Sequence, residues 1–174
     1  VNYSMFDSNE ILYTKLLGGT SYDVIVPSDY MIERLMEEGM LQPLDYSYMT
    51  NLDDLDPGVV ALRDEYDPDG VYSMPYFWGS VGLIYNKKNV DVDKLEELGW
   101  NILKDTEYAD RIFMYDSERD SFMVALKELG YSMNTENMDE INEAYEWLCE
   151  LHDTMHPAYV TDEVNDAMIN NEKD

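Results

Sequence analysis

The sequence is poor in cysteine and contains no long apolar run. Its single cysteine, Cys149, excludes an internal disulfide, so cysteine content neither requires nor excludes an extracellular location. No apolar stretch approaches the roughly 20 residues that a membrane-spanning helix needs, and no leader peptide is visible. The sequence opens inside a strand-like pattern at Val1 and stops at Asp174 just after a helical one, so we expect both ends to be cut from a longer chain.

Positive charge is scarce as well. Only 11 basic residues accompany 38 acidic ones, which gives a formal net charge of -27. Such a field repels nucleic acid and anionic membrane surfaces and attracts small cations, so no nucleic-acid partner is expected. Solubility alone is an alternative explanation of the acidity, and it stays open. Hydrophobic residues make up 45% of the chain, which is ordinary for a globular protein and argues against disorder.

Common catalytic signatures are missing. There is no GxSxG, no HExxH and no phosphate-binding glycine loop, so we predict a protein that is not an enzyme and needs no cofactor. One alternative is a metal-dependent enzyme built on Cys149, His152 and His156, which have helical spacing. A structural zinc site would need a fourth ligand, and the face of His152 resembles core, so we predict no metal site and a buried thiol at Cys149.

The chain does contain alternating strand and helix patterns. Strands are predicted for residues 1–6, 22–27 and 111–115, and helices for residues 8–17, 29–38, 91–98, 117–129 and 138–155. Residues 45–70 are predicted to be loops and turns, and residues 71–86 an extended segment interrupted at Trp78-Gly79-Ser80. This order predicts an α/β fold with a largely parallel sheet, and the break near residue 79 suggests two lobes.

Two of the predicted helices carry apolar stripes that should face a core. In residues 117–129 the stripe consists of Phe122, Ala125, Leu126 and Leu129. In residues 138–155 it consists of Met138, Ile141, Tyr145, Leu148, His152 and Met155. Gly130 and Pro157 end these helices.

An acidic segment, residues 115–120, lies where the predicted strand 111–115 meets a helix start. In open α/β sheets, ligands bind at the carboxyl ends of the strands. Asp116 and Asp120 are one helical turn apart and point away from the apolar stripe, an arrangement that suits an ammonium group. The structural alternative is that Asp116 or Ser117 caps the helix and Asp120 complements the helix dipole.

Aromatic residues provide a second kind of candidate contact, because their faces attract alkylammonium groups and pack on methylene chains. Tyr30 follows the end of the predicted strand 22–27, and Trp78 lies at the predicted crossing between lobes. The neighbouring Tyr76 and Phe77 are better explained as core residues.

Several segments, taken in order, resemble the spermidine/putrescine-binding proteins of bacterial ABC importers. They are residues 8–16 (SNEILYTKL), 22–45, 74–86 (MPYFWGSVGLIYN), 114–135 and 158–164 (AYVTDEV). No single segment is specific, but the ordered set covers nearly the whole chain. The resemblance implies a periplasmic-binding protein type II fold, truncated at both ends, in which two lobes with βαβ sheets close over a polyamine.

The same resemblance implies how the chain is divided. Residues 1–79 would form part of lobe one, without its N-terminal strand and helix. Residues 80–174 would form part of lobe two, without its C-terminal portion and the return to lobe one. Because half of the cleft would be missing, we expect weak or no ligand binding by this chain alone. Exposed sheet edges would make self-association plausible.

The resemblance also implies which residues contact the ligand. Ser28 and Tyr30 would do so from lobe one, and an acidic pair at the start of a lobe-two helix would hold the amines. The later member of the pair falls on Asp120, whereas the earlier falls on Ser117, so the adjacent Asp116 is a candidate substitute. The predicted ligand-binding residues are therefore Ser28, Tyr30, Trp78, Asp116, Ser117 and Asp120.

The implied partners are a polyamine and the membrane permease subunits of an importer. The implied location is extracytoplasmic, and whether the parent protein has a lipid anchor or a fusion to the permease stays open. Two further alternatives stay open. One is a binding protein of the same fold for another solute, such as a sugar or a metal ion, and a sugar site would show stacking aromatics without the acidic pair. The other is an acidic interaction module with no ligand cleft.

Overall fold

The computed structural model describes residues 1–161, 163–170 and 172–173. The chain divides into two compact units, unit 1 (Val1–Ser80) and unit 2 (Val81–Asp174). The division lies beside the predicted interruption at Trp78-Gly79-Ser80, while the assignment of the units to two lobes stays a prediction. Within the described residues, none of the helices is both long and apolar enough to cross a bilayer.

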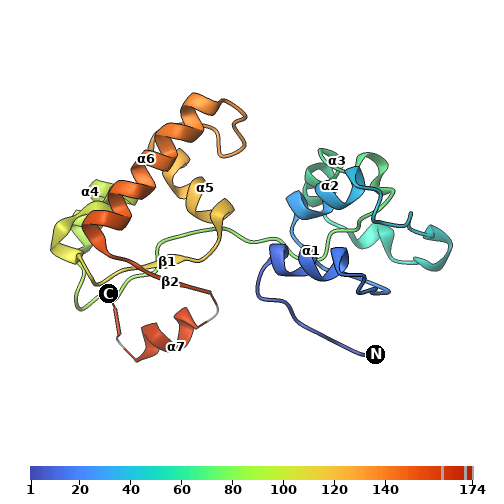
Figure 1. The fold of residues 1–174 in the computed structure, drawn as a ribbon, viewed down its shortest axis with the longest axis horizontal. Coiled ribbons are helices and arrows are strands. Elements are labelled where there is room, and N and C mark those ends of the chain that lie inside the picture. Colours follow the sequence, from blue (N-terminus) through green and yellow to red (C-terminus); the bar gives the residue numbers. More distant parts are fainter. Residues whose placement is uncertain (162, 171, 174) are drawn as a thin grey trace. The chain divides into compact units, whose positions relative to one another are not determined.

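Figure 1 shows the elements of each unit. Unit 1 contains the helices α1 (Asn9–Leu17), α2 (Asp29–Glu37) and α3 (Pro57–Asp64), with 3-10 turns at Tyr46–Tyr48, Leu52–Asp54 and Pro68–Gly70. Unit 2 contains α4 (Val92–Leu98), β1 (Phe113–Tyr115), α5 (Glu118–Glu128), α6 (Met138–Met155), β2 (Ala158–Val160) and α7 (Val164–Ile169), with 3-10 helices at Gly99–Lys104 and Thr106–Tyr108.

The first two helices of unit 1 form where the sequence predicts them. Ser8 caps α1 by accepting a hydrogen bond of 3.3 Å from the backbone N–H of Ile11, because a short hydroxyl side chain satisfies an amide that has no partner in the first turn. The core of this unit includes Leu12, Met31 and Leu35, none of which is more than 1% exposed.

The strands predicted in unit 1 do not form. Residues 1–6 and 22–27 have no strand assignment, and every residue from 1 to 80 is described. Val24 is 79% exposed and Val26 is 56% exposed, so this apolar run is not buried. A strand is stable only when a neighbouring strand pairs with its backbone N–H and C=O groups, and neither segment has such a partner among the described residues.

Residues 45–70, predicted to be loops, contain the helix α3. Asp56 caps it by accepting hydrogen bonds from the N–H groups of Gly58 (2.7 Å) and Val59 (3.3 Å), and Pro57 occupies the first helical position. The prediction of a turn at Asp-Pro-Gly is therefore wrong. Aspartate followed by proline is equally a signal for a helix start, and here the helical alternative forms.

A buried aspartate holds the chain that follows α3. Asp67 is 1% exposed. Its Oδ2 accepts hydrogen bonds from the N–H groups of Tyr72 (3.0 Å) and Ser73 (2.6 Å) and from the Ser73 hydroxyl (2.7 Å). These bonds fix the backbone at the start of the extended segment that leads to Trp78.

Unit 2 contains a parallel pair of strands, as the predicted α/β fold requires. Phe113 pairs with Ala158, Met114 with Tyr159 and Tyr115 with Val160. Helices α5 and α6 lie between these strands in the sequence, because parallel strands need a long crossover connection. The helices begin and end within one residue of their predicted bounds.

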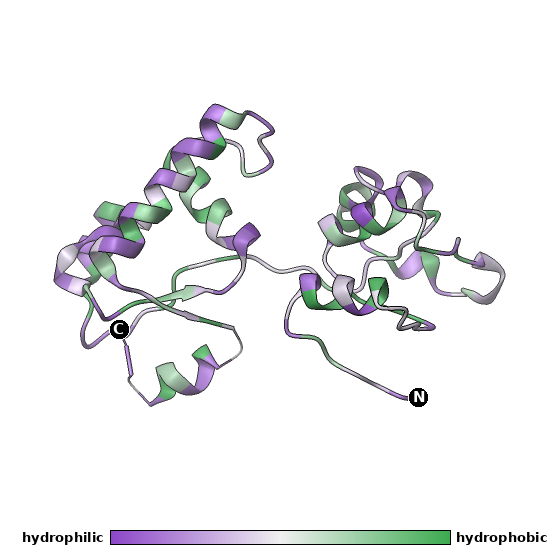
Figure 2. Ribbon diagram, viewed as in Figure 1, coloured by the Kyte–Doolittle hydropathy of each residue, from purple (hydrophilic) through white to green (hydrophobic). Residues whose placement is uncertain are grey.

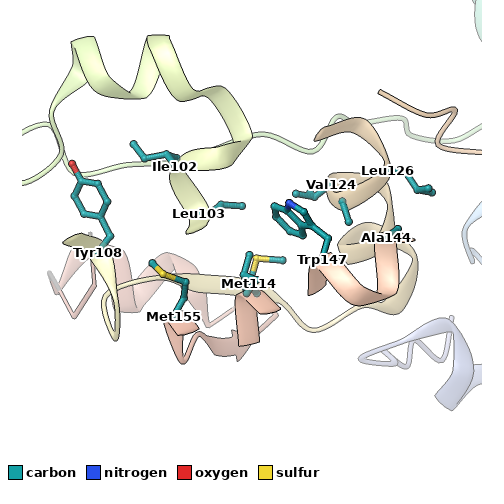
Figure 3. Close-up of a cluster of buried hydrophobic side chains, with 11 residues drawn as sticks. Ile102, Leu103, Tyr108, Met114, Val124, Leu126, Ala144, Trp147 and Met155 are labelled. Carbon is teal, nitrogen blue, oxygen red and sulfur yellow. The ribbon is translucent and has the colours of Figure 1, made fainter. Parts of the chain in front are cut away.

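The core of unit 2 lies between α5, α6, β1 and the 3-10 helices (Figure 3). Its buried members are Ile102, Leu103, Tyr108, Met114, Val124, Ala125, Leu126, Ala144, Trp147, Leu151 and Met155. Figure 3 shows Leu103, Val124 and Trp147, from three different elements, gathered together. The predicted stripe of α5 is confirmed, with Phe122 and Leu129 partly buried against this core.

The stripe predicted for α6 is wrong apart from Met155 and the partly buried Ile141 and Leu148. Met138 is 61% exposed and Tyr145 is 58% exposed, and His152 is also exposed. The buried positions are Ala144, Trp147, Leu151 and Met155, spaced by three or four residues on an adjacent face. Figure 2 shows hydrophilic and hydrophobic residues alternating along this helix. The packing partners therefore decide which face is buried.

Candidate functional site

In unit 1 the predicted contact Ser28 lies at the start of α2. It is the N-cap residue, but its side chain makes no capping hydrogen bond. Instead, its hydroxyl accepts a hydrogen bond of 3.1 Å from the side-chain amide of Asn9, and its N–H donates to Asn9 Oδ1 at 3.1 Å. Asn9 thus fixes both the backbone and the hydroxyl of Ser28 from the first position of α1.

Tyr30 joins the same network. Its hydroxyl oxygen accepts a hydrogen bond of 2.9 Å from Asn9 Nδ2, and its hydroxyl proton is donated to Glu10 Oε1 at 2.8 Å. Partial burial raises the pKa of the Glu10 carboxyl, but the hydrogen bond from Tyr30, together with hydrogen bonds from Ser8 and the backbone and the charge of Arg34, lowers it overall. The structure therefore brings Ser28 and Tyr30, two of the ligand contacts predicted in unit 1, into one hydrogen-bonded network.

Trp78, the third predicted contact of unit 1, lies in the extended segment and is 77% exposed. Tyr76 and Phe77 are 71% and 83% exposed, so their assignment to the core is wrong. Their rings pack edge to face with centroids 4.3 Å apart. The segment has no strand partner among the described residues, so no neighbouring backbone brings a layer of side chains over these rings.

In unit 2 the predicted acidic segment follows the carboxyl end of β1. Ser117 is the N-cap of α5, and its hydroxyl accepts a hydrogen bond of 3.3 Å from the N–H of Asp120. Asp116 is exposed and donates its backbone N–H to the carbonyl of Val160 at 2.8 Å. Asp120 is partly buried in the first turn of α5.

These contacts confirm the structural alternative for Ser117, which caps the helix. They also put Asp120 where a carboxylate complements the helix dipole. A capping role and a ligand contact are compatible, since a first-turn carboxylate has oxygens beyond those that its own backbone engages. The roles of Asp116, Ser117 and Asp120 in ligand binding stay predictions.

The residues of the metal-enzyme alternative lie in a different chemical setting. His152 is exposed, and its Nδ1 lies 3.2 Å from the Tyr159 hydroxyl. His156 ends α6 in the left-handed conformation, with Nδ1 3.3 Å from the Asp110 carboxylate. Across residues 1–161, 163–170 and 172–173, no three or more His, Cys, Asp or Glu side chains form a group that could hold a metal ion. The metal-enzyme alternative therefore has no support in this geometry, and Cys149 is partly rather than fully buried.

Asn9 and Glu10 belong to the hydrogen-bonded network around Ser28 and Tyr30, although the sequence does not predict them as site residues. Their pattern indicates only the opening of a helix, and their contacts with Ser28 and Tyr30 span 19 to 21 residues. Local spacing carries no signal for such a pairing. A polar pair at the start of one helix, followed by a Ser-x-Tyr at the start of the next, is the only hint in the sequence.

Comparison with known proteins shows a likeness to solute-binding proteins. The spermidine/putrescine-binding periplasmic protein of Escherichia coli is 38% identical over 179 residues, covering 97% of this chain and 50% of that protein. The substrate-binding protein PotD of a spermidine/putrescine ABC transporter from Streptococcus pneumoniae has a solved structure with a TM-score of 0.74 and 37% identity, covering 99% of this chain and 52% of that one. A Listeria monocytogenes structure, itself a candidate spermidine/putrescine ABC transporter, has a TM-score of 0.84 at 37% identity, with coverage of 99% and 52%.

The chain spans about half the length of the curated relatives it matches. Its likeness to solved structures extends over nearly the whole chain, so it has the α/β fold of the PotD-type periplasmic binding proteins. The family and the relatives named here are solute-binding proteins rather than enzymes. Residues 20–173 match the family model described as "Bacterial extracellular solute-binding protein", and this chain belongs to that family.

Proposed function

We propose that this chain is part of the solute-binding component of an ABC importer and that the component captures polyamines such as spermidine and putrescine. The observation that carries the proposal is the 38% identity, over 97% of this chain, with a protein named for binding spermidine and putrescine. The net charge of -27 is consistent with it, because a strongly negative protein attracts multivalent organic cations.

The candidate contacts supply the two kinds of chemistry that a polyamine needs. The carboxylates of Asp120 and Asp116 pair with protonated amines, and the ring of Trp78 packs against the methylene chain. Ser28, Tyr30 and Ser117 supply hydroxyl groups. In this proposal units 1 and 2 belong to the two lobes, ligand binding favours a closed state, and the permease recognises that state.

The location and partners follow from the same proposal. The relatives are periplasmic proteins, so we infer an extracytoplasmic location for this one. The permease subunits of the importer are its expected partners. A lipid anchor, a fusion to the permease, and self-association of the isolated chain through the exposed apolar segments 1–6 and 22–27 are the finer parts of the proposal.

Calorimetric titration with spermidine and putrescine tests the proposal, using the gene product that contains this sequence. We expect binding in the micromolar range or tighter. Asp120→Asn should weaken it by about 1.5–3 kcal/mol, the scale of a hydrogen bond to a charged group. Asp139→Asn is the matched control, because Asp139 is an exposed aspartate in the first turn of another unit 2 helix and the substitution changes the net charge equally.

Two results would contradict the proposal. Absence of binding at micromolar concentrations of both polyamines would refute the function. Equal losses in Asp120→Asn and Asp139→Asn would show that the protein attracts polyamines only through its net charge, and the assignment of Asp120 to a site would then be abandoned.

A further inference from the structure

We infer that Glu10, together with Asn9, is a positioning residue that makes the Tyr30 hydroxyl a hydrogen-bond acceptor and so sets a preference for protonated amines. The inference rests on the proposed function, because it takes Ser28 and Tyr30 to be ligand contacts. It deepens that function by identifying which residues of unit 1 determine the polarity of those contacts.

The Asn9 side chain uses all of its hydrogen-bonding groups. A primary amide has two N–H donors and one carbonyl acceptor. The Asn9 amide nitrogen donates to the Ser28 hydroxyl at 3.1 Å and to the Tyr30 hydroxyl at 2.9 Å, and its carbonyl accepts the Ser28 N–H at 3.1 Å. Because all three groups of Asn9 are used, its orientation is fixed, and it approaches both hydroxyl oxygens as a donor.

The phenol of Tyr30 has a single proton to donate. Tyr30 donates that proton to Glu10 Oε1 at 2.8 Å. An ionised carboxylate can only accept hydrogen bonds, and a hydroxyl has one proton, so the phenol has no second proton to offer to a ligand. Any ligand group that reaches this oxygen must itself be a donor.

A protonated amine carries donors only, as a lysine ammonium does, and it is therefore complementary to an oxygen restricted to accepting. The Glu10 carboxylate adds a negative charge one hydrogen bond away from that oxygen. The other groups that favour the ionised form of Glu10 are its backbone and Ser8, which donate hydrogen bonds, and Arg34, which is positively charged.

The substitution Glu10→Gln isolates this effect, since it keeps the size of the side chain and removes the charge. A glutamine can turn its amide nitrogen toward Tyr30 and donate to the oxygen. The phenol proton is then released to point elsewhere, and an approaching ammonium meets a donor. Glu37→Gln is the matched control, because Glu37 is an exposed glutamate on α2 and the same charge is lost.

A measurement without ligand tests the hydrogen bond directly. With 13C-labelled tyrosine, the Cζ resonance of Tyr30, assigned through Tyr30→Phe, should shift as the pH is lowered below about 4.5, where glutamate ordinarily titrates. The shift should disappear in Glu10→Gln and persist in Glu37→Gln. A Tyr30 resonance in the unaltered chain that does not respond as the pH falls from about 6 to about 2, a range that extends well below the ordinary glutamate pKa of about 4.3 because the pKa of Glu10 is lowered, overturns the inference.

A second measurement tests the preference for amines, using the gene product that contains this sequence. Glu10→Gln should weaken spermidine binding about tenfold or more, the fold-change that follows from losing a charge-assisted contact. Glu37→Gln should bind as the unaltered protein does. If the unaltered protein binds spermidine and Glu10→Gln binds equally well, the inference is overturned and the function stands. If the unaltered protein does not bind, the function fails, and the resonance of Tyr30 still decides whether Glu10 accepts its proton.

Discussion

At the scale of single residues, the polar cluster around Arg63 in unit 1 leaves no room for a side chain at Gly70. This glycine has a φ of +61°, a left-handed conformation that side chains rarely adopt. A Cβ atom there would overlap the guanidinium group of Arg63, which is 8% exposed, and would lie 2.7 Å from the hydroxyl of Tyr46, which donates to the Gly70 carbonyl. Both the backbone conformation and the surrounding atoms therefore require glycine.

We expect Gly70→Ala to lower the free energy of unfolding of unit 1 by about 2–4 kcal/mol, the sum of left-handed backbone strain and displacement of buried side chains. Gly39→Ala is the control, because Gly39 has a φ of +65° and no other atom lies within 4 Å of the point where a Cβ would stand. It should lose only the strain, about 1 kcal/mol. Urea denaturation followed by circular dichroism measures both. Equal losses would mean that Arg63 and Tyr46 move aside without cost.

The candidate site residues differ in how far the sequence predicts their surroundings. The cap at Ser117 is predictable as the structural alternative, because its partner Asp120 lies three residues away. The partner of Ser28 and Tyr30 is not, because Asn9 is 19 and 21 residues distant. Sequence spacing encodes contacts within one helical turn, whereas contacts between helices depend on how the two helices pack.

At the scale of elements, the sequence predicts helices better than strands, because helices are stabilised by local contacts and strands by distant ones. Helix α6 satisfies its backbone internally, and its predicted bounds, Met138 and Met155, are those observed. Residues 22–27 depend on a neighbouring strand, and Val24-Ile25-Val26 forms no strand pair although its composition favours a strand. The chain spans about half of its relatives' length, and a strand forms only where a partner segment is present to pair with it.

The buried face of α6 is the basis of a second stability prediction. Leu151 is fully buried, so Leu151→Ala should destabilise unit 2 by about 2–5 kcal/mol through loss of apolar burial and the cavity left behind. Tyr145 belongs to the face predicted from the sequence but is 58% exposed, and Tyr145→Ala should change stability by no more than about 0.5 kcal/mol. Thermal unfolding of the two variants measures the contrast. A larger loss of stability in Tyr145→Ala than in Leu151→Ala would show that the face predicted from the sequence is the buried one.

At the scale of the whole molecule, the net charge of -27 acts on every measurement of polyamine binding. Cations accumulate around such a chain whether or not a site exists, and this effect weakens as salt screens the field. Binding at a site that pairs an ammonium with a partly buried carboxylate is screened less. Titrations at low salt alone therefore do not separate binding at the proposed site around Asp120 from general attraction.

Repulsion among the acidic side chains should also lower the stability of the folded chain. Raising NaCl from about 0.01 M to about 1 M shortens the Debye length from about 30 Å to about 3 Å, so like charges on the folded chain repel less. The unfolded chain spreads its charges further apart and gains less from screening. For each kcal/mol that salt adds to the free energy of unfolding, the midpoint of thermal unfolding should rise by about 2–4 °C for a chain of this size.

KCl at equal ionic strength should act as NaCl does, and an uncharged sugar at equal osmolality separates screening from general solute effects. A midpoint that stays constant or falls with salt would mean that favourable ion pairs, such as that of Lys94 with Glu107 at 2.7 Å, outweigh the repulsion. The acidity of this chain would then not limit its stability. The excess of carboxylates would have to be explained by the cations that they attract.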